Sequence, residues 1–119
     1  MNLICVRFQR EGFHKWDNAP DNRAYLRETH RHVFHVEAQV EVHTDEREIE
    51  FHDLLCFCKQ KFPQGHRGNL GGQSCETLAR KLVEEIREAY PKRMVKVSVF
   101  EDGEVGAIVR IDVPVHRSQ

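Results

Sequence analysis

Histidine is the residue type whose number and spacing first suggest chemistry in this chain. Eight of the 119 residues are histidines, and His30 and His32 stand two residues apart at the start of an alternating segment. Residues two apart in a β-strand point to the same face, with Cα atoms about 7 Å apart. Both imidazoles could therefore bind one metal ion, with His14 from the long loop before them as a third ligand. Three neutral imidazoles leave a fourth tetrahedral position open, as in catalytic zinc sites; the alternative is hydrogen-bonded core histidines.

Glu101 is the second residue of chemical interest. It shares the parity of Val95, Val97 and Val99, so it ends an apolar strand face with a carboxylate. An inward carboxylate is strongly unfavourable unless it is paired. A ligand with an amidine-like pair of N–H groups would satisfy it through two parallel hydrogen bonds. The alternative is a partly exposed residue at the end of a strand.

The elements that must position these residues can be predicted from hydrophobic periodicity. Alternation predicts strands at 2–9, 30–43, 95–99 and 105–113, with a short strand at 49–51 and a hairpin turn at 102–103. Helical spacing predicts helices at 54–62 and, after the N-cap Ser74, up to residue 90. Residues 10–29 and 63–73 are expected to be loops. Two strands, two helices and two strands predict an α+β fold with an antiparallel sheet and both helices on one face.

Composition and charge exclude several classes of protein. The 119 residues should form one domain, and 18 basic against 19 acidic residues give a net charge of −1. So balanced a charge disfavours nucleic-acid binding, and no apolar run is long enough to span a membrane. The first residues lack the pattern of a secretory signal, and the four cysteines do not form a disulfide framework. We therefore expect reduced thiols and a cytoplasmic location.

The motifs together resemble the 6-pyruvoyltetrahydropterin synthase / 6-carboxytetrahydropterin synthase family. The resemblance covers about residues 2–111, and it is carried by His14, His30-Arg31-His32, residues 49–54, Ser74-Cys75-Glu76 and residues 97–101. It implies the tunnelling fold (T-fold), in which subunits join their antiparallel sheets into a barrel. The partners implied are a small pterin substrate and further copies of the chain, as a trimer or hexamer.

The resemblance also assigns roles to individual residues. His14, His30 and His32 match the family's zinc ligands, although Arg31 replaces the glycine of its His-Gly-His motif. Glu101 matches the glutamate that holds the amino-pyrimidine edge of the pterin. Ser74 and Glu76 match further pterin contacts, although Glu76 could equally interact only with the helix dipole.

The departures from the family concern catalysis. The family's catalytic cysteine is missing, since residues 23–29 read Arg-Ala-Tyr-Leu-Arg-Glu-Thr, and Glu28 is the nearest candidate base. The family's Asp-His relay is at best half present, as His66, whose alternative is a plain loop residue. The implied activity is a zinc-dependent lyase that converts 7,8-dihydroneopterin triphosphate to 6-carboxy-5,6,7,8-tetrahydropterin on the route to deazapurines such as queuosine. The alternatives are cleavage to a 6-hydroxymethylpterin with a glutamate base, or zinc and pterin or purine binding without turnover.

Overall fold

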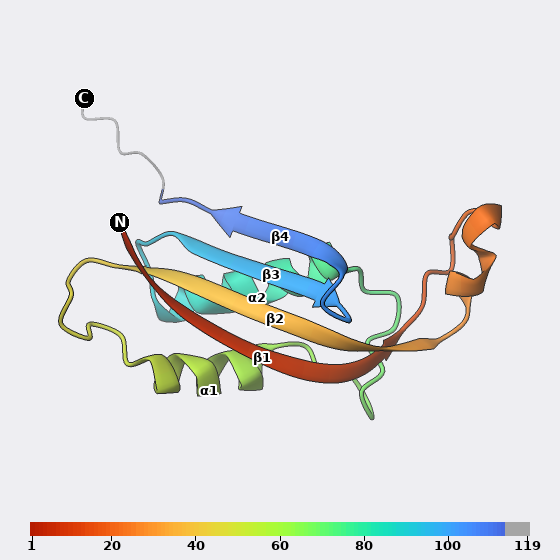
Figure 1. Ribbon diagram of the computed structural model, residues 1–119, viewed down its shortest axis with the longest axis horizontal. Helices are drawn as coiled ribbons and strands as arrows, with labels where there is room; N and C mark the ends of the chain where they lie inside the picture. The colour runs from red at the N-terminus through yellow and green to blue at the C-terminus, as the bar shows by residue number, and fades with distance from the viewer. Residues whose placement is uncertain (114–119) are drawn as a thin grey trace.

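A computed structural model describes residues 1–113 and confirms the predicted order of two strands, two helices and two strands (Figure 1). The domain predicted over 1–119 thus includes six residues, 114–119, that lie outside the described part. The elements are β1 (Asn2–His14), the 3₁₀ helix η1 (Asp21–Arg27), β2 (His30–Val42), α1 (Phe51–Lys61), α2 (Cys75–Ala89), β3 (Val95–Glu101) and β4 (Val105–Ile111).

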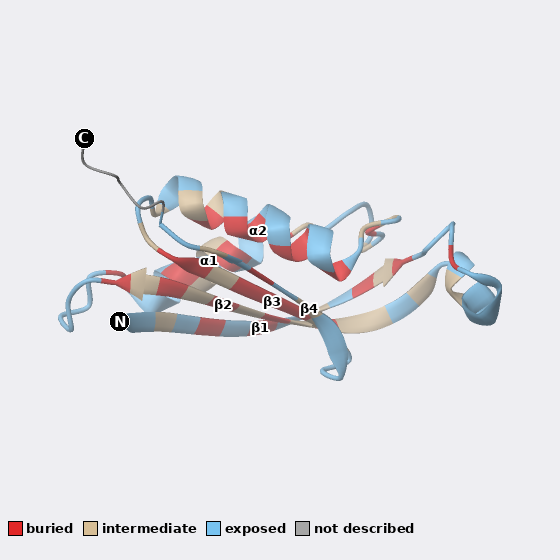
Figure 2. Cartoon of the chain, turned by 90° about the horizontal axis from the view of Figure 1, so that it is seen from above, coloured by how far each residue is buried: buried red, intermediate tan, exposed pale blue. Residues whose placement is uncertain are grey.

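The four strands form one antiparallel sheet in the order β1-β2-β3-β4, and both helices cover the same face (Figure 2). Alternate residues of β2 and β3 bury their side chains beneath the helices, as the alternation predicts. α2 packs on β3 and β4, and α1 packs against β1. The fully buried side chains of this core include Phe34, Val36, Val40, Val95, Val97, Val99, Leu54, Leu78, Leu82 and Ile86. No helix in the described part of the chain is long and apolar enough to cross a membrane.

β1 is longer than the predicted strand 2–9, because it continues to His14 and pairs with β2 along its whole length. The alternation of apolar and polar residues in β1 stops at Arg10, Glu11 and Gly12, so the sequence does not show that the strand continues. Gly12 is nevertheless buried, since a Cβ there would lie 3.1 Å from side-chain atoms of Leu70 and Phe34. The segment 10–29, predicted to be irregular, therefore begins as strand and also contains η1.

The start of α1 also differs from the prediction. The short strand expected at 49–51 is absent, since α1 begins at Phe51 rather than at residue 54. The Glu50 side chain caps the helix by accepting a 2.9 Å hydrogen bond from the Asp53 amide, which satisfies one free N–H of the first turn. β4 ends at Ile111, two residues earlier than expected.

The loop 63–73 fixes the end of β1 to the start of α2. Its backbone exchanges hydrogen bonds with the outer edge of β1, from the Phe13 amide to the Gly68 carbonyl (2.8 Å) and from the Leu70 amide to the Phe13 carbonyl (2.6 Å). The N-cap Ser74 then begins α2 by accepting a 3.1 Å hydrogen bond from the Thr77 amide, as predicted. This connection holds the first turn of α2 beside the C-terminal end of β1.

The β3–β4 hairpin requires glycine at position 106. An ideal Cβ at Gly106 would lie 2.0 Å from the Val99 carbonyl oxygen, a distance that real Cβ atoms do not show. We expect Gly106→Ala to lower the free energy of unfolding by about 1–3 kcal/mol, the usual cost of overpacking. Urea denaturation measures this, and Gly72→Ala is the control, because its nearest neighbour would be the Lys15 carbonyl oxygen at 3.9 Å. Equal stabilities of the two variants would contradict the close hairpin approach.

Candidate metal centre and adjoining pocket

Three histidines meet where β1 and β2 extend past the end of β3. The register pairs His14 directly with His30 and places Gly12 opposite His32, so that all three imidazoles share one face. His14 thus lies on a strand rather than in the loop expected from the sequence. The ring centroids lie 4.5 Å (His14–His30), 5.1 Å (His14–His32) and 4.9 Å (His30–His32) apart. One ligand nitrogen from each residue lies within 4.8 Å of the others, which is close enough to bind one metal ion.

The Nδ1 atom of each imidazole faces an oxygen atom of the surrounding chain. His32 Nδ1 donates to Asp102 Oδ2 (2.7 Å), His30 Nδ1 donates to the Glu28 carbonyl (2.8 Å), and His14 Nδ1 lies 3.4 Å from the Gln73 carbonyl. Carbonyl and carboxylate oxygens can only accept hydrogen bonds, so the Nδ1 atoms carry the protons. The Nε2 atoms are then left with free lone pairs, the form that binds metal ions.

Two of these Nε2 atoms, those of His14 and His32, are buried and form no hydrogen bond in the described chain, and without a proton they cannot donate to the nearby Glu101 carboxylate. A buried polar atom without a partner costs about 1–3 kcal/mol, and such atoms in folded proteins commonly indicate an ion or a water molecule. A divalent cation would satisfy both nitrogens at once. The donor set of three imidazoles fits zinc, as predicted from the sequence.

The Glu101 carboxylate lies beside the same imidazoles. Its Oε1 atom is 3.1 Å from His14 Nε2, and its Oε2 atom is 3.5 Å from His32 Nε2. The Cys75 thiol contacts it from α2, with Sγ 3.7 Å from Oε1. The carboxylate therefore points inward at the end of β3, and it places a negative charge next to the candidate metal centre.

Burial determines the protonation of the groups around this centre. Burial lowers the pKa of His14, and positive charge on His30 or His32 would lower it further, against the opposing effects of the Gln73 carbonyl and Glu101. His14 is therefore neutral near pH 7. Burial, helped by Glu101, raises the pKa of the Cys75 thiol to about 12, so this cysteine is protonated and is a poor nucleophile.

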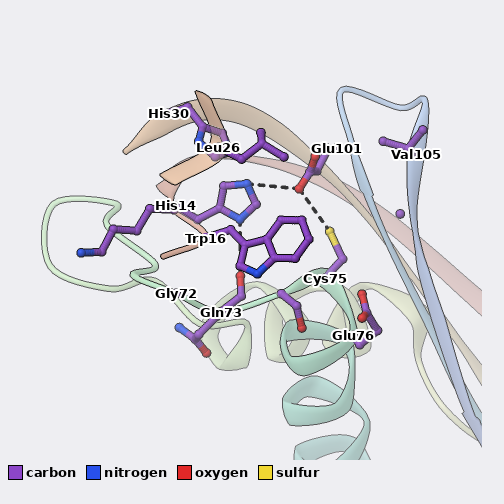
Figure 3. Close-up of a pocket in the computed structure, with 13 residues that line it drawn as sticks. His14, Trp16, Leu26, His30, Gly72, Gln73, Cys75, Glu76, Glu101 and Val105 are labelled. Carbon is purple, nitrogen blue, oxygen red and sulfur yellow. Dashed lines mark hydrogen bonds and ion pairs between the residues drawn. The ribbon is translucent and has the colours of Figure 1, made fainter. Parts of the chain in front are cut away.

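A pocket of about 430 Å³ opens beside the histidines (Figure 3). Its walls come from the end of β1, the start of α2 and the β3–β4 hairpin. The lining residues with functional groups are His14, Lys15, Trp16, His30, Gln73, Ser74, Cys75, Glu76 and Glu101. The flat Trp16 indole is half exposed, and its backbone amide is held by the Leu26 carbonyl at 2.7 Å. The pocket thus combines candidate metal ligands, acidic side chains beside them and an aromatic wall.

The structure brings together six of the eight residues predicted for the site. Ser74, Glu76 and Glu101 adjoin the three histidines, although the Ser74 hydroxyl also caps α2. Glu28 and His66 are exposed and do not line the pocket. Glu28 contributes its backbone carbonyl to His30, and His66 pairs with Asn69 within the loop 63–73.

Sequence reasoning missed three contributors to the site. Asp102 was predicted only as a turn residue, yet its carboxylate holds His32. Trp16 lay in a segment without a clear pattern, and Gln73 acts through its backbone, which no sequence motif reports. The one available signal was the Asp-Gly turn directly after the inward Glu101, which places a second carboxylate close to the histidines.

The metal centre predicts a clear difference between two neighbouring histidines of β2. Loss of a residue that only hydrogen-bonds to a ligand lowers metal affinity about 10- to 100-fold. His32→Ala removes a ligand itself, so zinc affinity should fall further than that. His35→Ala is the matched control, because His35 lies on the opposite face of the same strand. Competition with a chromophoric chelator measures both affinities. Equal zinc affinities in the two variants would rule out the three-histidine centre.

Comparison with known proteins adds no assignment to this site. The sequence matches no protein-family model and no curated protein. The resemblance drawn from the motifs therefore stays a prediction, and the function of the chain rests on the residues of the pocket.

Proposed function

We propose that the chain is a zinc-dependent lyase of the pterin synthase type. Its substrate is 7,8-dihydroneopterin triphosphate, and its product is 6-carboxy-5,6,7,8-tetrahydropterin on a route to deazapurines. The observation that carries the proposal is the convergence of three imidazoles beside an inward carboxylate, next to a pocket that His14, His30 and Glu101 line. The four described cysteines are free, in keeping with the cytoplasmic location that we propose.

Two groups of the site, the histidines and the Glu101 carboxylate, suit two parts of such a substrate. Zinc, when bound by His14, His30 and His32, would polarise the hydroxyl groups of the substrate's side chain. Directly beside these imidazoles, Glu101 has two oxygens that can accept the adjacent N–H groups of an amino-pyrimidine edge. Glu76 also lines the pocket, at the N-terminus of α2.

A flat heterocycle also suits the wall formed by Trp16. Aromatic rings prefer offset-stacked or edge-to-face contacts, and the half-exposed indole offers such a surface inside the pocket. Trp16 is also the only tryptophan of the chain, so its fluorescence reports directly on occupancy of this pocket.

Proton transfer in this proposal falls to Glu28, with His66 as a relay. Both side chains are exposed and lie outside the pocket. They can act only if binding of the substrate or of a neighbouring subunit moves them next to the pocket. The same placement favours a second candidate function, a zinc- and pterin- or purine-binding protein without turnover. Cys75 does not replace the base, because its thiol is protonated.

The proposal includes assembly of identical subunits into the T-fold barrel, as a trimer or hexamer. The strand β4 ends the described sheet, and Val105 and Ile108 on it are 64% and 53% exposed. On the other side, β1 has no neighbouring strand in residues 1–113. Open strand edges with exposed apolar residues favour pairing with further strands.

Turnover decides between the enzyme and the binding protein. Zinc-loaded protein should convert 7,8-dihydroneopterin triphosphate to a carboxypterin, identified by mass spectrometry, and Glu28→Gln should reduce the rate while leaving quenching of Trp16 fluorescence by the substrate unchanged. A hydroxymethylpterin product would instead assign the other cleavage. Quenching without any product would favour the binding protein, and neither quenching nor product would reject a pterin ligand.

Assembly is tested separately by mass in solution. Light scattering after size-exclusion chromatography should give three or six times the 14.0 kDa of one chain. We expect Ile108→Asp to reduce this mass, because a charge on the exposed face of β4 opposes burial against another subunit. Arg110→Asp is a control on the same strand at a residue already exposed and polar. A single-chain mass for the unaltered protein would contradict the barrel.

A further inference from the structure

The turn between β3 and β4 is tied to β2 by three hydrogen bonds from one residue. The Asp102 amide donates to the Val33 carbonyl (2.7 Å), and Asp102 Oδ1 accepts from the Val33 amide (2.9 Å). The second carboxylate oxygen, Oδ2, accepts from His32 Nδ1 at 2.7 Å. One carboxylate oxygen of Asp102 thus accepts from the backbone of β2, and the other accepts from a candidate metal ligand.

The turn conformation alone does not explain this residue. Asp102 and Gly103 have φ values of 55° and 73°, which asparagine or glycine would adopt as readily at position 102. The bond to His32 is more demanding, because the side chain must then supply two acceptors, one for the Val33 amide and one for His32 Nδ1. A carboxylate meets this requirement at both of its oxygens, whereas a carboxamide has one accepting oxygen and one donating nitrogen.

We propose that Asp102 is a positioning residue of the metal centre, which fixes the His32 tautomer so that Nε2 presents its lone pair to the ion. The inference rests on the metal centre of the proposed function and adds a residue to it. It also gives the turn a role in the site, since Asp102 directly follows Glu101. The anchor to Val33 and His32 thereby fixes the end of β3 where the Glu101 carboxylate meets the imidazoles.

The geometry predicts an unusual consequence for Asp102→Asn. If the amide oxygen keeps the hydrogen bond from the Val33 amide, the –NH₂ group faces His32 Nδ1. Nδ1 can accept that bond only as an unprotonated nitrogen, so the proton moves to Nε2 and the metal-binding lone pair is lost. The variant therefore has almost the shape of the native side chain but favours the wrong tautomer.

The experiment compares Asp102→Asn with Asp112→Asn in the full chain. Asp112 is an exposed aspartate beyond the opposite end of β4, and its carboxylate accepts from Arg110 Nε at 2.8 Å. Zinc affinity, measured by chelator competition, should fall about 10- to 100-fold in Asp102→Asn and remain unchanged in Asp112→Asn. In metal-free protein, ¹⁵N NMR of the imidazoles should show His32 protonated at Nδ1 in the unaltered chain and at Nε2 in Asp102→Asn.

The two readouts separate this inference from the proposed function. Native zinc affinity and an unchanged His32 tautomer in Asp102→Asn would overturn the role of Asp102. An unaltered chain that binds no zinc would instead overturn the metal centre, and with it the role given to Asp102. If Asp102→Asn does not fold, Asp102→Gly serves in its place, because glycine suits the φ of 55° and removes both side-chain bonds. Native zinc affinity in that variant would likewise overturn the proposal.

Discussion

The pairing register of β1 with β2 is the constraint on which the rest of the site depends. It places His14 opposite His30 and Gly12 opposite His32, so that one imidazole from β1 lies beside two from β2. A shift by one residue would turn the side chains of one strand to the other face of the sheet. The register is fixed where the buried side chains of Val6 and Phe8 on β1 pair with Ala38 and Val36 of β2 in the core. Hydrophobic packing therefore sets the geometry of a polar site.

This geometry is unfavourable unless something binds to it. Two Nε2 atoms are buried without partners, and each such atom costs about 1–3 kcal/mol. The fold keeps them in place by the hydrogen bonds that the Nδ1 atoms donate and by the packing of His14 against Phe34, whose ring centroids lie 5.4 Å apart. Sites that bind ligands commonly sacrifice local stability in this way, because the bound group restores the missing interactions.

Much of this arrangement could be predicted from the sequence because period and parity are local properties. The two-residue spacing of His30 and His32, the inward Glu101 and the cap Ser74 all follow from neighbours within a few positions. The extension of β1 to His14 could not be predicted, because Gly12 is buried through contacts with residues distant in the chain. The outer partners of the histidines were missed for the same reason, since Asp102 lies 70 positions after His32 and Gln73 acts through a carbonyl.

The consecutive carboxylates of Glu101 and Asp102 at the end of β3 lie on opposite sides of the His32 ring. Asp102 holds His32 from behind at Nδ1, while Glu101 lies in front of it, 3.5 Å from Nε2. A cation bound at the Nε2 atoms would attract the Glu101 carboxylate, whereas an amino-pyrimidine edge would draw the same carboxylate toward its N–H groups. A metal ion and a heterocycle would therefore act on the same side chain. Because Asp102 anchors the backbone next to it, movement of the Glu101 side chain can occur without displacing His32.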